Sequence, residues 1–131
     1  MSSLIKIAID AMGGDNSPKK IIDGIKKHHI SNTNVFYKIF GDEEKINKLL
    51  DNDINKSNYE IVHTKKKVLS EDSPLEAAKR GKDTSMWLAI ESVKKKDCDI
   101  VISAGNTGAL LVISKLNLKM IDNIDKPALS A

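Results

Sequence analysis

The chain has 131 residues, of which 40% are hydrophobic and 30% are charged, and its formal net charge is +3. This composition is typical of a folded globular domain and argues against disorder, and so small a net charge does not by itself indicate a nucleic acid or a membrane as partner. Only 4% of the residues are aromatic, which argues against stacking platforms for single-stranded nucleic acid.

A glycine turn follows the first predicted strand, a run of branched apolar residues at 4–9. Gly13 and Gly14 can adopt positive φ and leave backbone N–H groups open to a ligand. Ser17 is predicted to cap the next helix, with Pro18 at its first position. A strand, a glycine turn and a helix N-terminus together predict an anion site. An ordinary tight turn is the alternative, because the spacing fits neither the dinucleotide fingerprint nor the P-loop.

Helices and strands then alternate along the chain. Further strands are predicted at 34–40, 59–63 and 99–102, and helices are predicted to begin at Asp42, at Ser73, at Asp83 or Thr84, and in the turn before residues 109–113. This alternation implies parallel strands joined by right-handed crossovers. We therefore expect an α/β fold, a three-layer αβα sandwich with a mainly parallel sheet. Residues 126–131 are interpreted as a loop leading into another strand, so residues 1–131 are expected to be the N-terminal part of a single truncated domain.

No metal site is predicted. His28 and His29 are adjacent on a helix and point about 100° apart, and no cysteine or carboxylate cluster accompanies them. The single cysteine, Cys98, excludes an internal disulfide and is predicted to be a buried structural thiol. The lysine run 65–67 is interpreted as solvated surface. No apolar run has membrane-spanning length and no signal peptide is recognisable, so we expect a soluble, cytoplasmic protein.

A second glycine turn follows the predicted strand 99–102. It contains two glycines and three uncharged donors, namely Gly105, Gly108, Ser103, Asn106 and Thr107. Both glycine turns leave the carboxyl ends of parallel strands, where open α/β sheets bind ligands. The pair therefore predicts a shared phosphate or carbonyl site. The alternative is a capped turn with Asn106 or Thr107 as the N-cap.

Three blocks of sequence resemble the PlsX family, the bacterial phosphate acyltransferases of phospholipid synthesis. They are IAIDAMGGDNSP at 7–18, RGKDTSM at 80–86 and ISAGNTGALL at 102–111. Thr84 stands where serine is expected in the family. The family is longer than this chain, so the resemblance covers its N-terminal part. It implies a fold like that of the isocitrate and isopropylmalate dehydrogenases, incomplete in this chain, and a homodimer.

The resemblance also implies a reaction. Acyl-[acyl carrier protein] and orthophosphate would give acyl phosphate and free carrier protein, as a step of phospholipid and fatty acid metabolism. No metal or organic cofactor would take part. The expected partners are acyl-[acyl carrier protein], orthophosphate and a second copy of the chain, with peripheral association at the inner face of the membrane and no nucleic acid.

This chemistry needs a held phosphate nucleophile and donors for the oxyanion. The expected phosphate- and substrate-binding residues are Gly13, Gly14, Asp15, Asn16, Ser103, Gly105, Thr107 and Gly108. The candidate catalytic residues are Asn106, Asp10 and Lys82, of which Asn106 would donate to phosphate or to the oxyanion. Asp10 and Asp15 are expected to orient Lys82 or to accept a proton from monobasic phosphate, or else only to hold the turn and cap the helix. Lys82 is either a distal phosphate contact or a solvated cation.

Three other functions stay open at this point. The first is a non-catalytic phosphate- or carrier-protein-binding fragment whose catalytic complement lies beyond residue 131. The second is a dehydrogenase-like enzyme, which would need a dinucleotide fingerprint where the chain has residues 12–15. The third is a nucleotide-binding regulator, which is disfavoured because no P-loop lysine follows either glycine turn.

Overall fold

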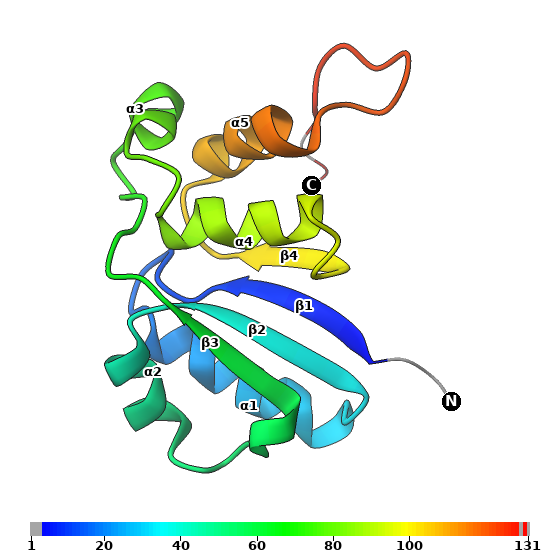
Figure 1. The fold of residues 1–131 in the computed structure, drawn as a ribbon. Helices are drawn as coiled ribbons and strands as arrows, with labels where there is room; N and C mark the ends of the chain where they lie inside the picture. The colour runs from blue at the N-terminus through cyan, green and yellow to red at the C-terminus, as the bar shows by residue number, and fades with distance from the viewer. Residues whose placement is uncertain (1–3, 129, 131) are drawn as a thin grey trace.

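A parallel four-stranded sheet forms the centre of the computed structural model, which describes residues 4–128 and 130 (Figure 1). The strands are β1 (Ile5–Asp10), β2 (Val35–Gly41), β3 (Tyr59–His63) and β4 (Ile100–Ser103). Each lies within one residue of its predicted position. Their spatial order is β3-β2-β1-β4, and every neighbouring pair is parallel. The sheet thus changes its winding direction at β1, between β2 and β4.

Helices cover both faces of this sheet, so the predicted three-layer α/β architecture is confirmed. The helices are α1 (Lys19–Ser31), α2 (Glu43–Leu50), α3 (Pro74–Lys79), α4 (Ser85–Lys94) and α5 (Thr107–Leu118), with a short 3-10 turn at Lys56–Asn58. Figure 1 shows α1 and α2 on one face and α4 on the other, with α5 and α3 beyond α4. The likeness to the isocitrate and isopropylmalate dehydrogenases stays a prediction.

The second half of β1 is buried on both faces, which accounts for the apolar residues there, whereas Ile5 and Lys6 at its start are exposed. Ile9 belongs to the core between the sheet and α1, where it joins Ile22 and Ile25. Ala8 belongs to the opposite core, with Ala89 of α4. Because helices pack against both sides of β1, the end of this strand is held firmly, and the turn that follows it has a fixed starting point.

Side-chain caps fix four of the helix starts, as the sequence predicts. Asp42 caps α2, the Ser73–Glu76 capping box begins α3, Thr84 caps α4 and Asn106 caps α5. The prediction for Ser17 is wrong. Its hydroxyl instead donates to the Gly13 carbonyl at 2.6 Å, and Pro18 stands at the N-cap of α1 without a side-chain cap. The hydroxyl turns back into the glycine turn because Gly13 offers an acceptor there.

The end of the chain contains no strand in the part that is described. Residues 126–128 and 130 have no regular secondary structure, and Leu129 and Ala131 lie outside the described residues. The absence of regular structure at 126–128 and 130 agrees with the loop expected there, and the strand expected to follow that loop stays a prediction. In the part of the chain that the structure covers, none of the helices is long and apolar enough to cross a membrane.

Candidate functional site

The two glycine turns meet at the carboxyl edge of the sheet, as the sequence predicts. In register, Asp10 at the end of β1 pairs with Ser103 at the end of β4. A Cβ on Gly13 would lie only 3.0 Å from the Gly105 Cα, and one on Gly14, whose φ is +87°, would lie 2.5 Å from the Ala104 carbonyl oxygen. The backbones of the two turns are therefore in direct contact, which any side chain at Gly13 or Gly14 would prevent.

Asp10 holds this junction together. Its carboxylate is buried and accepts hydrogen bonds from the backbone N–H groups of Met12 and Gly13, both at 3.1 Å. It also accepts from the hydroxyls of Ser85 at 2.6 Å and Ser103 at 2.8 Å. The first turn, the start of α4 and the end of β4 are thus tied to one carboxylate. Of the roles expected for Asp10, this contact set corresponds to turn hydrogen bonding.

Lys82 lies apart from this junction. It is exposed, and within residues 4–128 and 130 it forms no ion pair with a carboxylate, Asp10 included. Its neighbour Asp83 pairs instead with Lys66 at 2.7 Å. The structure therefore does not bring Lys82 together with Asp10 or Asp15, and a role for Lys82 in phosphate binding stays a prediction.

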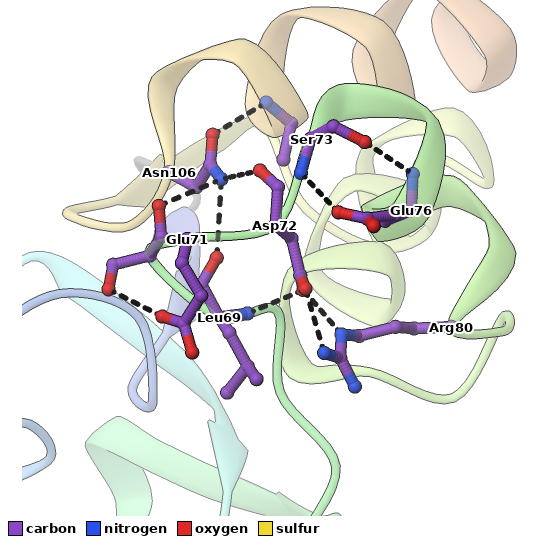
Figure 2. A network of polar contacts seen from close by, with 9 residues as sticks. Leu69, Glu71, Asp72, Ser73, Glu76, Arg80 and Asn106 are labelled. Atoms are coloured by element: carbon purple, nitrogen blue, oxygen red, sulfur yellow. Dashed lines mark hydrogen bonds and ion pairs between the residues drawn. The ribbon is translucent and has the colours of Figure 1, made fainter.

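Both ends of the Asn106 side chain are engaged (Figure 2). Its Oδ1 accepts from the Ala109 N–H at 3.0 Å and so caps α5. Its Nδ2 donates to the carbonyl oxygens of Asp72 at 2.6 Å, Leu69 at 3.2 Å and Ser70 at 3.4 Å. The capped-turn interpretation is therefore correct for Asn106. A direct contact with phosphate or an oxyanion would require Nδ2 to release these carbonyls.

A polar cavity of about 300 Å³ opens over the first glycine turn. One side is lined by Met12, Gly14, Asp15, Asn16 and Ser17, and the other by residues 67–71. Three of the predicted binding residues, Gly14, Asp15 and Asn16, thus face one space. The predicted residues of the second turn, Ser103, Gly105, Asn106, Thr107 and Gly108, do not line it. The second turn reaches the cavity only indirectly, because Asn106 holds the far wall.

The first turn offers unused backbone donors to this cavity. Among the described residues, the N–H groups of Gly14, Asp15 and Asn16 donate to no protein acceptor. Gly14 and Asn16 both have positive φ, at +87° and +58°. Successive amides in such alternating backbone conformations form a concave nest that suits an anion. The anion site predicted from the glycines is therefore geometrically available at residues 14–16.

Sequence reasoning misses the ion pair between Asp72 and Arg80. Asp72 is buried and accepts from Arg80 Nη2 at 2.7 Å, from Arg80 Nε and from the Leu69 N–H at 2.9 Å. Despite the opposing effect of burial, the Arg80 guanidinium lowers the pKa of the Asp72 carboxyl, and Asp72 in turn raises the pKa of Arg80. The one available signal was that Arg80 begins the second block of family resemblance.

Cys98 and His28 have surroundings typical of residues with a structural role. Burial raises the pKa of the Cys98 thiol, which favours the neutral, unreactive form. His28 Nδ1 lies 2.7 Å from the Tyr37 hydroxyl. Across residues 4–128 and 130, no three histidine, cysteine, aspartate or glutamate side chains gather closely enough to hold a metal ion.

Comparison with known proteins shows the family to which the chain belongs. A family model described as "Fatty acid synthesis protein" matches residues 5–131. The chain belongs to this family. It is 74% identical to the phosphate acyltransferase of Pelagibacter ubique over its whole length, and 45% identical to that of Listeria monocytogenes strain HCC23 over 96% of the chain. It is 39% identical to that of Afipia carboxidovorans over 99% of the chain.

These relatives are much longer than the chain. The aligned part makes up 39% of the Pelagibacter protein, 36% of the Listeria protein and 37% of the Afipia protein. The chain thus spans well under half the length of the curated relatives it matches. The resemblance to the phosphate acyltransferases that the three sequence blocks indicate is confirmed.

Proposed function

We propose that this chain is the N-terminal part of a single-domain phosphate acyltransferase. The enzyme would convert acyl-[acyl carrier protein] and orthophosphate to acyl phosphate and free carrier protein. The observation that carries the proposal is the set of unused amides at residues 14–16, which line a cavity of about 300 Å³ at the sheet's switch point. The names of the relatives supply the reaction class, and the nest of amides supplies a place for the phosphate.

The chemistry follows from these positions. A phosphate oxygen attacks the thioester carbonyl carbon, so that a C–O bond forms and the carbonyl oxygen becomes an oxyanion. When the oxyanion collapses, the C–S bond breaks and the thiolate of the carrier protein leaves with the electron pair. Asp15, which is exposed at the cavity wall, accepts the proton of monobasic phosphate and returns it to the thiolate. Asp15 is favoured over Asp10 because the Asp10 carboxylate already accepts four hydrogen bonds.

Holding phosphate and thioester together is the main catalytic contribution in this proposal. Aligning two reactants supplies roughly 7–11 kcal/mol in ideal intramolecular cases. A thiolate is a good leaving group, so no covalent enzyme intermediate is needed. The proposal includes a cytoplasmic homodimer with peripheral membrane association, as the family resemblance implies.

A non-catalytic phosphate-binding fragment is the second candidate. It is favoured by the hydrogen bonds that engage Asp10 and Asn106, two of the three residues predicted to be catalytic. Assaying acyl phosphate formation by the 131-residue chain and by a full-length family protein separates the two functions. Phosphate binding without turnover, by the chain alone, would support the fragment.

The direct test is a phosphate titration followed by amide NMR. We expect shifts concentrated at the N–H groups of Gly14, Asp15 and Asn16, because these groups have no protein acceptor. Sodium chloride at matched ionic strength is the control and should leave the three signals in place. If phosphate moves other amides only, or none at all, the nest is not the phosphate site.

A further inference from the structure

The far wall of the cavity is a segment held almost entirely by polar contacts. We call residues 67–72 the wall segment. Val68 is its one fully buried apolar side chain, whereas Ser70 and Glu71 are exposed. With so little apolar surface to bury, the position of the segment depends on its hydrogen bonds.

Anchors from two helices fix the wall segment (Figure 2). From the start of α5, Asn106 Nδ2 donates to the carbonyls of Leu69, Ser70 and Asp72. From the end of α3, Arg80 binds the Asp72 carboxylate through two nitrogens. The same carboxylate accepts from the Leu69 N–H, which closes a tight turn. Through Asn106, the second glycine turn is thereby connected to the segment that lines the cavity opposite the first glycine turn.

The wall segment adds a lysine to the lining of the cavity. Lys67 is the sole cation among the residues that line this space, and the carboxylates of Asp15 and Glu71 line it too. Within the described part of the chain, Lys67 forms no ion pair, while the preceding Lys66 is paired with Asp83. The two carboxylates repel phosphate, and a cation in the same lining would offset that repulsion.

We propose that Lys67 is a phosphate-binding residue, and that Asp72 and Arg80 are positioning residues which hold the wall segment so that Lys67 faces the amides of residues 14–16. This inference rests on the proposed function, since it names a further contact of the same phosphate site. It also reverses the interpretation of the lysine run 65–67 as solvated surface, for Lys67 alone.

The first test compares Lys67→Gln with Lys65→Gln in the full-length enzyme. Lys65 is also exposed and belongs to the same run, but it does not line the cavity. We expect Lys67→Gln to raise the phosphate KM about tenfold or more, because a charge-assisted contact is lost. The KM for acyl-[acyl carrier protein] should stay unchanged, Lys65→Gln should match wild type and Lys67→Arg should restore most of the phosphate affinity.

The second test asks whether Arg80 acts through Lys67. Arg80→Gln should raise the phosphate KM, and it should add little in a Lys67→Gln background, because both changes remove the same contact. Arg80→Lys should retain part of the effect of arginine. Asp72→Asn changes the other partner of the ion pair and serves as a second variant. Circular dichroism melting confirms that each variant is folded.

Two results overturn the inference. One is a wild-type phosphate KM in Lys67→Gln, and the other is full additivity of the Lys67→Gln and Arg80→Gln effects. If the wild-type enzyme forms no acyl phosphate, the proposed function fails instead. In that case phosphate affinity measured by calorimetry on the same variants decides the inference, and equal affinity in Lys67→Gln and Lys65→Gln rejects it.

Discussion

Asp10 shows how one buried carboxylate organises a loop junction. An unpaired buried charge is strongly destabilising, but four donors from three segments satisfy this one. The donors include the hydroxyls of Ser85 and Ser103, which lie 75 and 93 residues away in sequence. The carboxylate thus fixes the relative position of the two glycine turns, and the nest at residues 14–16 depends on that position.

A matched pair of glycine substitutions tests the packing at this junction. Gly13→Ala should destabilise the fold by about 1–3 kcal/mol, because its Cβ would lie 2.5 Å from Asp10 Oδ2 and 3.0 Å from the Gly105 Cα. Gly24→Ala, in the middle of α1, meets no atom within 4 Å and should stabilise by about 0.5–1 kcal/mol. Urea unfolding measures both. Equal effects would mean that the turns are not in contact.

At the scale of elements, α3 connects to the cavity through the Asp72–Arg80 ion pair. Because Arg80 lowers the pKa of Asp72, the folded state binds the Asp72 proton less readily than the unfolded state does. The stabilisation is therefore fully present above the unfolded pKa, about 3.9, and is lost as the pH falls toward the lowered folded pKa.

Comparison of wild type with Asp72→Asn tests this linkage. The difference in unfolding free energy should be constant from about pH 7 to pH 5 and should shrink below about pH 4, where the unfolded aspartate becomes protonated. Thermal unfolding across this range measures it, with Asp97→Asn as an exposed control whose effect should be small throughout. A difference that stays constant down to pH 3 would contradict the pairing.

Features that depend on neighbouring residues could be predicted from the sequence, whereas features that depend on contacts formed in the fold could not. The caps at Asp42, Ser73, Thr84 and Asn106 depend on residues three positions along the chain, so the sequence pattern reveals them. The hydrogen bond of the Ser17 hydroxyl could not be predicted, because the Gly13 carbonyl comes within its reach only once the glycine turn has folded.

The candidate site also combines features that local sequence predicts with features that depend on distant contacts. Glycine-rich turns after strands predict an anion site from local sequence alone, but the positive φ of Asn16 in the first turn was not predicted. The engagement of Asn106 could not be predicted, because its three carbonyl partners lie 34–37 residues away. Nor does a run of three lysines reveal which of them faces a cavity, since that depends on how the wall segment is anchored.

At the scale of the whole molecule, the strand order places the site. The chain lays down β1, β2 and β3 in one direction and then crosses back over the other face to add β4 beside β1. The crossover returns through α3 and α4, so these helices and the wall segment arrive above the ends of β1 and β4 (Figure 1). The cavity therefore forms where open α/β sheets ordinarily bind ligands.

The same strand order leaves β4 partly uncovered, because on this face α1 packs over β1 and not over β4. Ile9 and Ile102 are partners in register, yet Ile9 is 4% exposed and Ile102 is 49% exposed. An apolar hollow of about 290 Å³ lies between α1 and this part of the sheet. Apolar surface of the sheet is thus exposed on this face.

Substitution of these two register partners measures how far α1 covers the sheet. Ile9→Ala should lower the unfolding free energy by about 2–5 kcal/mol, because it leaves a cavity in the core with Ile22 and Ile25. Ile102→Ala removes the same atoms from a half-exposed position and should cost about 1 kcal/mol or less. Urea unfolding of both variants in the 131-residue chain gives the comparison. Equal losses would mean that in solution the face of β4 is as well covered as that of β1.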